Sequence, residues 1–591
     1  MKLIIKYLKR HKFLFVLNLV AILAYTATEL GIPTIMAAMI NHGVSTQDMD
    51  FIQSRGMILI LISLIGGVGS ILMSYASSRM ASRMTRDIRN DLFDKSQEFS
   101  HSEYNEFGVS SMITRVSSDV YQLQLFTQLL LRMGLTSPFM IGVSAFLIFT
   151  TNAKLALLMT LSIPFILLVV YSVGKLSGPL SRKQQEFMDV MNRITRENIT
   201  GVRVVRAFRK DKAETERFRV TNEEYAKVSK QLFRVMARAE PLFFFILNCS
   251  ALVIAWNAAG MIEVGSIGVG TLVAFFEYQF QALFSLLLFS IVFIMYPRAA
   301  VSARRIEEVL NTVPLIQNPE NGVHEGITGE PSVEFIDVDF AYPDSEAKVL
   351  EGISFSAKKG ETVAFIGSTG SGKSTLINLI VRFYDVSSGS IKVDGVDVRD
   401  YDLYSLRDKV GFIPQKALLF SGSISENIRY GKEKAVDAEV VDSAKIASAD
   451  DFIQKKTHKY DEWLSEGGSN VSGGQNQRLS IARALVRRPD IYIFDDSFSA
   501  LDYKTDATIR KNLKEITKES IVFVVAQRIS SIVEADRIIV MNEGQVIGQG
   551  KHLELMKTCP IYVEIAKSQL SEEEMAQYEN ILKNVGFLKS I

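Results

Sequence analysis

The sequence contains very little cysteine and almost no net charge. Its 591 residues include only two cysteines, Cys249 and Cys559, which excludes a disulfide framework and leaves no metal-ligand spacing. Lys and Arg total 66 against 65 Asp and Glu, so the formal net charge is +1 and no basic excess indicates nucleic-acid binding. We therefore predict two inert thiols and no nucleic-acid partner.

Apolar residues gather in the first half of the chain. Crossing the roughly 30 Å hydrocarbon core of a bilayer takes about 20 mostly apolar residues. Six runs of that length occur, at 13–37, 57–80, 126–150, 153–177, 241–262 and 269–296. The first run is too long for a removable signal peptide and contains Pro33. These runs exclude a purely cytosolic enzyme and predict an all-α, six-helix membrane domain over 1–310, with long helical extensions into the cytoplasm.

Lys and Arg lie in alternate connections between these runs. They crowd the N-terminal segment, the connection after the second run and the stretch 175–240. By contrast, 38–56 has only Arg55, 151–154 has only Lys154, and 263–268 has no basic residue. Cytoplasmic connections carry the excess of positive charge. The pattern predicts a multi-pass protein of the cell membrane, in contact with membrane lipid, with both termini in the cytoplasm.

The second half of the chain has the pattern of a cytosolic α/β domain. Residues 311–332 are polar and rich in Pro and Gly, which predicts a linker. Over 333–570, short β-like runs such as Thr362–Ile366 and Ile491–Phe494 alternate with helical stretches. This alternation predicts a mixed sheet with helices on its faces. Residues 571–591 are expected to form a C-terminal tail.

The most specific motif is Gly367-Ser368-Thr369-Gly370-Ser371-Gly372-Lys373-Ser374. It follows the strand-like run TVAFI and precedes the helical run TLINLIVRF, the context in which this pattern forms a phosphate-binding loop (P-loop). Glycines let backbone N–H groups turn toward phosphate oxygens, and the following helix offers its positive end. The lysine reaches the β- and γ-phosphates and the serine ligates Mg²⁺. The second half is therefore predicted to be a P-loop nucleotide-binding domain.

Two further elements support a nucleotide site. The apolar run Ile491–Phe494 ends in Asp495, the arrangement that holds Mg²⁺ in P-loop nucleotidases. The run Val471-Ser472-Gly473-Gly474-Gln475 opens a helix and offers a second anion site, which has no substrate of its own in this chain. Such a site is expected where it covers a nucleotide that is bound by another domain.

In this order and spacing, the motifs resemble those of an ATP-binding-cassette (ABC) exporter half-transporter, which fuses one membrane domain to one nucleotide-binding domain. The resemblance covers nearly the whole chain, and the signature run differs only in Val471, where leucine is usual. It implies that short coupling helices lie near Ser102–Phe107 and Val204–Lys212, and that Ser465–Gly468 contacts them.

The resemblance also implies ATP and Mg²⁺ as cofactors. Tyr342 matches the aromatic residue on which adenine stacks, and Asp502 belongs to the loop that crosses the dimer interface. The implied nucleotide-binding residues are Tyr342, Gly367, Ser368, Thr369, Gly370, Ser371, Gly372, Lys373, Ser374, Thr375, Gln415, Ser472, Gly473, Gly474, Gln475 and Asp502. The implied metal ligands are Ser374, Gln415 and Asp495.

Two positions depart from the family at its catalytic groups. Asp496 stands where a glutamate polarises the attacking water, and Gln527 stands where a histidine contacts the γ-phosphate. The shorter side chain pulls the carboxylate back by about 1 Å, and misplacement of that size costs on the order of 10²-fold in rate. Glutamine also lacks an imidazole that could carry positive charge. We expect a weak or inactive site on this chain's own P-loop, as in the degenerate subunit of heterodimeric multidrug exporters.

The expected function is ATP-driven export of hydrophobic or amphipathic compounds, with a second ABC half-transporter as partner and small amphipathic molecules as substrates. Glu277 lies inside the sixth apolar run, where a carboxylate is costly unless it faces a wet pathway, and it is the candidate substrate residue. A homodimeric exporter with slow hydrolysis, a lipid or peptide exporter and an ATP-gated regulatory membrane protein remain open. An importer is disfavoured because its membrane and ATPase parts are usually separate chains.

Overall fold

The computed structural model describes residues 1–327, 329, 332–343 and 345–569, and it divides into two compact units. The helical unit comprises Met1–Gln97 and Val109–Thr312. The sheet unit comprises Glu98–Gly108 and the chain from Val313 onward. The predicted tail 571–591 lies outside the described residues, as do three residues of the predicted linker 311–332.

The described part of the helical unit contains six helical stretches that are long and apolar enough to cross a membrane. All six predicted apolar runs lie within them, which confirms the all-α, six-helix membrane domain. Its helices are α1 (Lys2–Leu8), α2 (Lys12–Ala38), α3 (Met49–Glu98), α5 (Val109–Thr114), α6 (Val120–Leu129), α7 (Leu135–Thr151), α8 (Ala153–Thr160), α9 (Ser162–Thr200), α10 (Val202–Ala207), α11 (Asp211–Met236), α12 (Ala239–Glu263) and α13 (Val269–Asn311).

Small residues bring α2 and α3 close together. A Cβ atom added to the buried Gly66 of α3 would lie 2.4 Å from Cγ2 of Thr28 on α2. The Thr28 hydroxyl also donates to the carbonyl of Ile62, at 3.1 Å. Gly67 lies on the exposed face of the same helix and has no neighbour within 4 Å of its Cβ position. Close backbone approach at small residues is how helices associate in a membrane.

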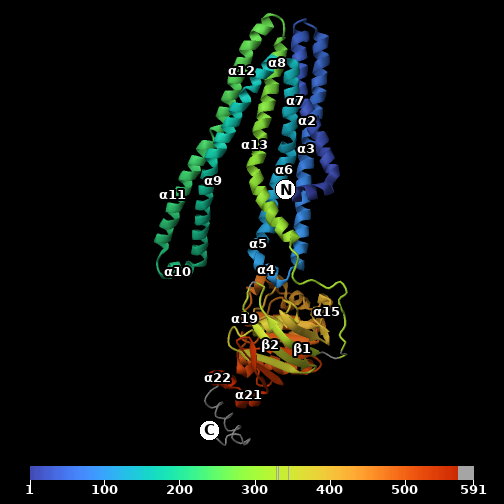
Figure 1. Cartoon of the computed structure of the whole chain (residues 1–591), viewed down its shortest axis with the longest axis vertical. Helices are drawn as coiled ribbons and strands as arrows, with labels where there is room; N and C mark the ends of the chain where they lie inside the picture. Colours follow the sequence, from blue (N-terminus) through green and yellow to red (C-terminus); the bar gives the residue numbers. More distant parts are fainter. Residues whose placement is uncertain (328, 330–331, 344, 570–591) are drawn as a thin grey trace. The chain divides into compact units, whose positions relative to one another are not determined.

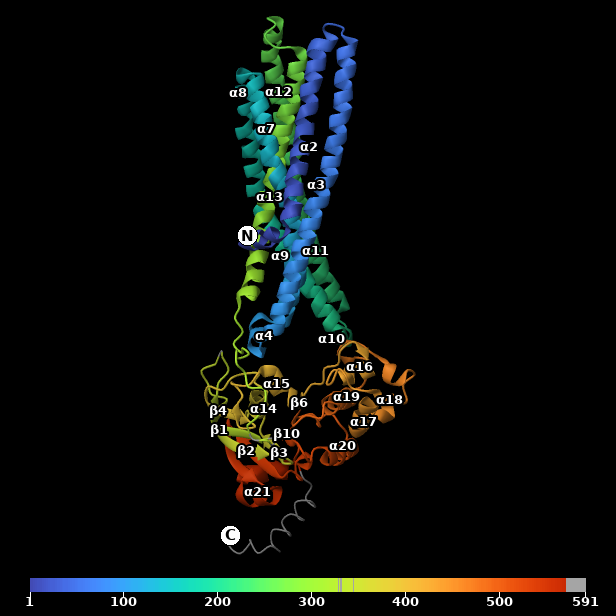
Figure 2. The same ribbon diagram turned by 90° about the vertical axis from the view of Figure 1, so that its right-hand side faces the viewer.

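Helices α9 and α11 form a long hairpin with α10 at its tip, as both views show (Figure 1, Figure 2). The Gln184 amide donates to the Ser229 hydroxyl at 2.9 Å, and the Asn198 amide donates to Glu214 at 2.9 Å. The predicted coupling helix at Val204–Lys212 begins and ends too late, because α10 covers Val202–Ala207 and α11 starts at Asp211.

The described residues of the sheet unit form two larger sheets and a two-stranded one. The first has six strands in the order β12-β11-β3-β10-β9-β6, and the second has four antiparallel strands in the order β2-β1-β4-β5. The strands are β1 (Ser332–Phe340), β2 (Leu350–Lys358), β3 (Thr362–Gly367), β4 (Ser388–Val393), β5 (Val396–Asp397), β6 (Val410–Ile413), β7 (Gly422–Ser423), β8 (Trp463–Leu464), β9 (Ile491–Asp495), β10 (Ile521–Val525), β11 (Arg537–Asn542) and β12 (Gln545–Gly550).

Strands β11, β3, β10, β9 and β6 of the first sheet run parallel. Every residue of β9 and β10 is buried, as expected for parallel strands that are covered on both faces. Apart from α4 (His101–Phe107), the described α-helices of this unit are α14 (Lys373–Ile380), α15 (Leu403–Asp408), α16 (Ile424–Arg429), α17 (Asp437–Ile446), α18 (Asp450–Ile453), α19 (Gly473–Leu485), α20 (Tyr503–Ile516), α21 (His552–Thr558) and α22 (Pro560–Gln569). The predicted α/β domain is thereby confirmed.

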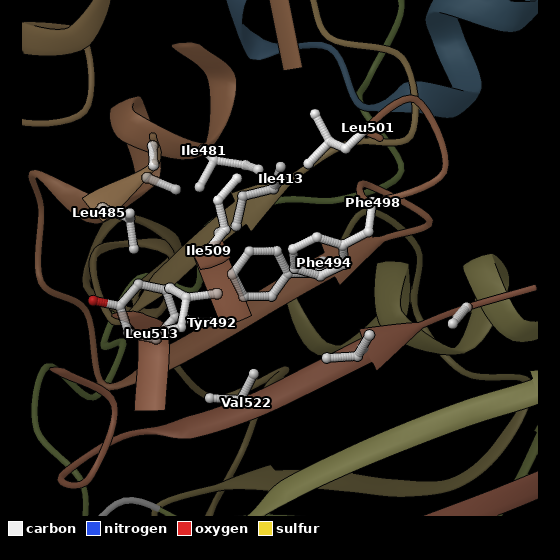
Figure 3. Packing of buried hydrophobic residues seen from close by; sticks show 14 of the residues in the cluster. Ile413, Ile481, Leu485, Tyr492, Phe494, Phe498, Leu501, Ile509, Leu513 and Val522 are labelled. Carbon is white, nitrogen blue, oxygen red and sulfur yellow. The ribbon is translucent and has the colours of Figure 1, made fainter. Parts of the chain in front are cut away.

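One core cluster fixes strand β9 in place. Tyr492 and Phe494 of β9 pack in it with Ile481 of α19 and Ile509 of α20 (Figure 3). All four side chains are almost completely buried. Because two residues on one face of the strand are held this way, the position of the next residue along β9, Asp495, is fixed as well.

Helix α14 ends earlier than the sequence predicts. The helical run TLINLIVRF was expected to continue to Phe383, but α14 ends at Ile380. Arg382 has a φ of 51°, in the left-handed region that no α-helix tolerates. The chain therefore turns after α14 and leaves Phe383 and Tyr384 in a loop.

Helix α4 (His101–Phe107) belongs to the sheet unit although it precedes α5 in the chain. It lies where the first coupling helix was expected. Its capping box is complete, since Glu103 accepts from the backbone N–H and the hydroxyl of Ser100. Glu103 also accepts from the backbone N–H of Leu315, at 2.9 Å. Burial opposes ionisation of Glu103, but these hydrogen bonds prevail and lower its pKa.

We predict that Gly66→Ala destabilises the chain and that Gly67→Ala does not. The new methyl group at 66 would overlap Thr28, and overpacking of this kind costs about 1–3 kcal/mol. At 67 the methyl group meets open space, and alanine is the better helix former. Thermal unfolding of the two purified full-length variants, followed by intrinsic fluorescence, tests this. Equal midpoints for both variants would contradict the packing argument.

Candidate functional site

The P-loop lies between the buried strand β3 and the helix α14. Gly372 is the N-cap of α14 and has a φ of 94°, which L-residues with a side chain rarely adopt. At Gly367, a Cβ atom would lie 2.1 Å from the carbonyl oxygen of Met541 on β11. Both glycines are thus required by the backbone itself, and the predicted strand, loop and helix order is present.

The Lys373 side chain lies inside this loop. Its Nζ donates to the carbonyl oxygens of Gly367 (2.9 Å) and Ser368 (2.7 Å) and to the Ser371 hydroxyl (3.2 Å). Burial lowers the pKa of Lys373, while the carboxylates of Asp496 and Asp495 oppose that shift. The ammonium group is therefore held at the centre of the loop with two carboxylates nearby.

Ser374 of α14 contacts Asp495 at the end of β9. The Ser374 hydroxyl donates to Oδ1 of Asp495 at 2.8 Å. Burial raises the pKa of Asp495, the charge of Asp496 adds to this effect, and the Ser374 hydrogen bond opposes it. Hydroxyl and carboxylate oxygens are the ligands that Mg²⁺ accepts beside phosphate oxygens. The residues present therefore fit a magnesium ion bound together with a nucleotide.

Asp496 is held by two amides. Nε2 of Gln415, just after β6, donates to Oδ2 of Asp496 at 3.1 Å. Nε2 of Gln527, just after β10, donates to the same oxygen at 2.9 Å. Asp496 is 7% exposed and has a φ of 46°. Aspartate is one of the few side chains that tolerate this left-handed backbone.

Burial raises the pKa of Asp496, whereas the hydrogen bond from Gln415 and the positive charges of Lys373 and Arg528 oppose that rise. The net pKa of Asp496 is raised, so the amides and cations compensate for burial only in part. The arrangement orients one oxygen of Asp496 very firmly, because both donors reach it from neighbouring parallel strands.

Tyr342 lies beside the P-loop helix. Its hydroxyl is 2.9 Å from the hydroxyl of Thr375, the residue after Ser374. Its ring contacts Phe340 edge-on at 5.0 Å and Tyr384 edge-on at 5.2 Å between centroids. An aromatic ring fixed next to a phosphate loop is suited to stacking on a nucleobase.

The signature run forms the start of α19. Ser472 is its N-cap, and the Ser472 hydroxyl accepts from the backbone N–H of Gln475 at 3.3 Å. The Gln475 amide oxygen in turn accepts from the N–H of Ser472 at 3.0 Å. Ser472 and Gly473 are exposed. Asp502 caps α20 in the same manner, accepting from Thr505.

The structure brings together the predicted residues Lys373, Ser374, Gln415, Asp495, Asp496 and Gln527. Among the hydrogen bonds of the described residues, none joins Ser472–Gln475 to this group. Glu277 lies on the exposed side of α13, in the other unit. Sequence reasoning missed Tyr384. The signal that could have found it is an aromatic residue directly after the P-loop helix.

Comparisons with known proteins agree on one family. The family model described as ABC transporter transmembrane region matches residues 15–287, and the one described as ABC transporter matches residues 350–499. An ABC transporter ATP-binding protein of Mycobacterium tuberculosis is 36% identical over 552 residues, which cover 93% of this chain and 94% of that protein. A protein of the same description from Bacillus subtilis is 35% identical, covering 96% and 98%.

Two further comparisons concern a lipid transporter and a solved structure. The ATP-dependent lipid A-core flippase of Thiobacillus denitrificans is 31% identical over 574 residues, covering 96% of this chain and 97% of that protein. A bacterial Atm1-family ABC exporter with ATP bound superposes with a TM-score of 0.80, covering 95% and 99% of the two chains. Because the two sequences are only 24% identical, the likeness to that structure shows the fold alone.

The six membrane-length helices, the P-loop and the two family models occur in one chain, in the order of an exporter-type transporter. With relatives above 30% identity along nearly the whole length, the chain is a multi-pass membrane protein with an ATPase domain. It belongs to the ABC transporter family, as a half-transporter.

Proposed function

We propose that this chain is one half of a heterodimeric exporter that uses ATP to move hydrophobic or amphipathic compounds of the multidrug type across the cell membrane. In this arrangement both termini are cytoplasmic. The partner is a second half-transporter that supplies a competent catalytic glutamate and histidine. The observation that carries the proposal is the pair of amides that donate to one oxygen of Asp496.

The nucleotide site on this chain binds ATP well and hydrolyses it poorly. Lys373, the backbone of the P-loop and the start of α14 hold the phosphates, and Tyr342 stacks on adenine. When bound, Mg²⁺ neutralises phosphate charge, and Ser374 and Asp495 are the residues placed to hold it. Among the residues that bind the phosphates and Mg²⁺, none departs from the family pattern.

The catalytic half is where the site is weak. A carboxylate oxygen has two lone pairs, and the Gln415 and Gln527 amides engage both on Oδ2 of Asp496. Oδ2 is then not free to accept a proton from water, which leaves this role to Oδ1 of the same short side chain. The shorter side chain adds to the effect, since a base must lie within hydrogen-bond reach of the proton that it removes. Gln527 is neutral where a histidine would stabilise negative charge on the γ-phosphate.

The signature half is intact and faces outward. Ser472 and Gly473 are exposed at the start of α19, a helix of 13 residues whose positive end suits a phosphate. We assign them to the nucleotide on the partner's P-loop. Each chain then contributes unequally: this one supplies the signature of the active site and the P-loop of the weak one.

Lipid export is the second candidate for the substrate class. It is favoured by the 31% identity to the lipid A-core flippase, over nearly the full length of both proteins. Transport of a fluorescent phospholipid and of a hydrophobic dye, measured side by side in vesicles that contain the heterodimer, separates the two. Movement of the lipid alone would replace the multidrug assignment.

Lys373→Ala is expected to abolish nucleotide binding on this chain while leaving partial ATP turnover by the heterodimer. The reason is that hydrolysis takes place at the other P-loop. ATPase rates of the purified heterodimer test this, with the exposed Lys434→Ala as a control that leaves the rate unchanged. Equal and complete loss from Lys373→Ala and from the matching lysine change in the partner would contradict the asymmetric model.

Ser472→Arg is expected to be far more damaging than Asp496→Asn. An arginine at 472 blocks the signature of the active site, and loss of a group that stabilises the reacting phosphate costs about 10²-fold. Asn at 496 changes a carboxylate that does not act as base. Both are read as ATPase rates of the heterodimer. If Asp496→Asn were the more damaging, Asp496 would be a working base and a homodimer with slow hydrolysis would be the better assignment.

Glu277→Gln is expected to weaken transport of a lipophilic cation by about fivefold, the effect of one nearby charge worth roughly 1 kcal/mol. Uptake of tetraphenylphosphonium and of its isosteric anion tetraphenylborate into inside-out vesicles provides the measurement. The anion should be unaffected, and basal ATPase should stay intact. Uniform loss for both ions would indicate a packing role for Glu277 instead.

A further inference from the structure

Ser497 follows Asp495 and Asp496 directly in the chain, and it is fully buried. Its hydroxyl donates to the carbonyl oxygen of Ile413 at 2.9 Å and lies 3.3 Å from the carbonyl oxygen of Asp495. The backbone ladder between β6 and β9 ends at the pair of Ile413 and Phe494. The Ser497 hydroxyl therefore continues the link between these two strands beyond their last backbone pair.

A second side chain holds the next carbonyl along the chain. Nε2 of Gln477 donates to the carbonyl oxygen of Pro414 at 3.3 Å. Gln477 belongs to α19 and is 2% exposed. Pro414 itself has no N–H with which to bond to a neighbouring strand. Ser497 and Gln477 thus form a carbonyl clamp, in which two buried donors from different elements hold the two residues directly before Gln415.

The residue that this carbonyl clamp positions has little else to fix it. Gln415 is exposed and lies outside any strand or helix. Holding a long glutamine side chain in one place costs conformational entropy, which its contacts must outweigh. Its Nε2 nevertheless donates to Oδ2 of Asp496, at 3.1 Å. The carbonyl clamp lowers that entropic cost, because it fixes the backbone from which the Gln415 side chain starts.

We infer that Ser497 is a positioning residue that keeps Gln415 on Oδ2 of Asp496. The amide then occupies a lone pair with which this carboxylate could otherwise accept a proton from water. Gln527 donates to the same oxygen from the other side, so release of Gln415 would free one of the two lone pairs. The inference rests on the proposed weak site, and it adds a cause that lies in the backbone rather than in the length of the aspartate.

The test measures ATP turnover at this chain's own P-loop. The full-length chain is assembled with a partner whose P-loop lysine is changed to alanine, so that hydrolysis at the partner's P-loop is removed. Ser497→Ala deletes the hydroxyl without adding volume, and we expect kcat to rise about threefold to tenfold, the effect of one hydrogen bond. KM for ATP should stay the same, because the P-loop and Lys373 are unaltered.

Ser520→Ala is the matched control. Ser520 is 7% exposed, and its hydroxyl donates to the carbonyl oxygen of Pro489 at 2.9 Å. These two residues precede β10 and β9, so their hydrogen bond lies at the opposite edge of the sheet. Ser520→Ala should lower the unfolding temperature by a similar amount and leave kcat unchanged. Gln477→Met, which removes the other donor of the carbonyl clamp, should raise kcat as Ser497→Ala does.

The Asp496→Asn background decides whether the effect passes through this carboxylate. With asparagine at 496 no carboxylate is present to take the proton, so Ser497→Ala should not change kcat there. An equal rise in both backgrounds would indicate general loosening of the site and would overturn the inference. An unchanged or lower kcat for Ser497→Ala in the unaltered background would overturn it as well.

Failure of the proposed function gives a different result. If the unaltered chain hydrolyses ATP at its own P-loop as fast as the partner does, the weak site itself fails, and the inference with it. If this site is slow, and Asp496→Glu raises kcat while Ser497→Ala does not, the weak site stands. Its cause is then the short side chain alone, and only the role of Ser497 fails.

Discussion

Parallel pairing of four strands is the constraint on which the whole nucleotide site depends. Val525 of β10 pairs with Asp495 of β9 on one side and with Phe365 of β3 on the other. Parallel strands place their carboxyl ends at one edge of the sheet. The P-loop after β3, the two carboxylates at the end of β9 and the two glutamines after β6 and β10 therefore converge, although about 160 residues separate the first from the last. A one-residue slip in this register would turn each of these side chains to the opposite face.

The sequence predicts those parts of the fold and of the nucleotide site that a local residue pattern specifies. The six apolar runs and the P-loop are such cases, because length and spacing alone specify them. The sequence could also show that Asp496 and Gln527 depart from the family. It could not show that Gln415 and Gln527 donate to the same oxygen, since that depends on the register of three strands. Tyr384 was missed because the apolar run after the P-loop reads as continuous helix, and only the left-handed backbone at Arg382 ends it.

The backbone at Asp496 favours the side chain that occupies it. Its φ of 46° is tolerated best by short side chains that bond to the local backbone, such as Asp and Asn. A longer side chain at this position would strain the turn more than aspartate does.

Helix α3 runs without a proline from Met49 to Glu98, 50 residues in all. At about 1.5 Å per residue it is a rod of roughly 75 Å, of which the bilayer core accounts for only about 30 Å. The structure keeps α3 as one helix throughout, including the glycine-rich stretch 66–70 where a bend would be easiest. A tilt of about 5° around one end carries the other end through about 6 Å. A helix of this length therefore converts a small change of tilt at one end into a displacement of several ångströms at the other.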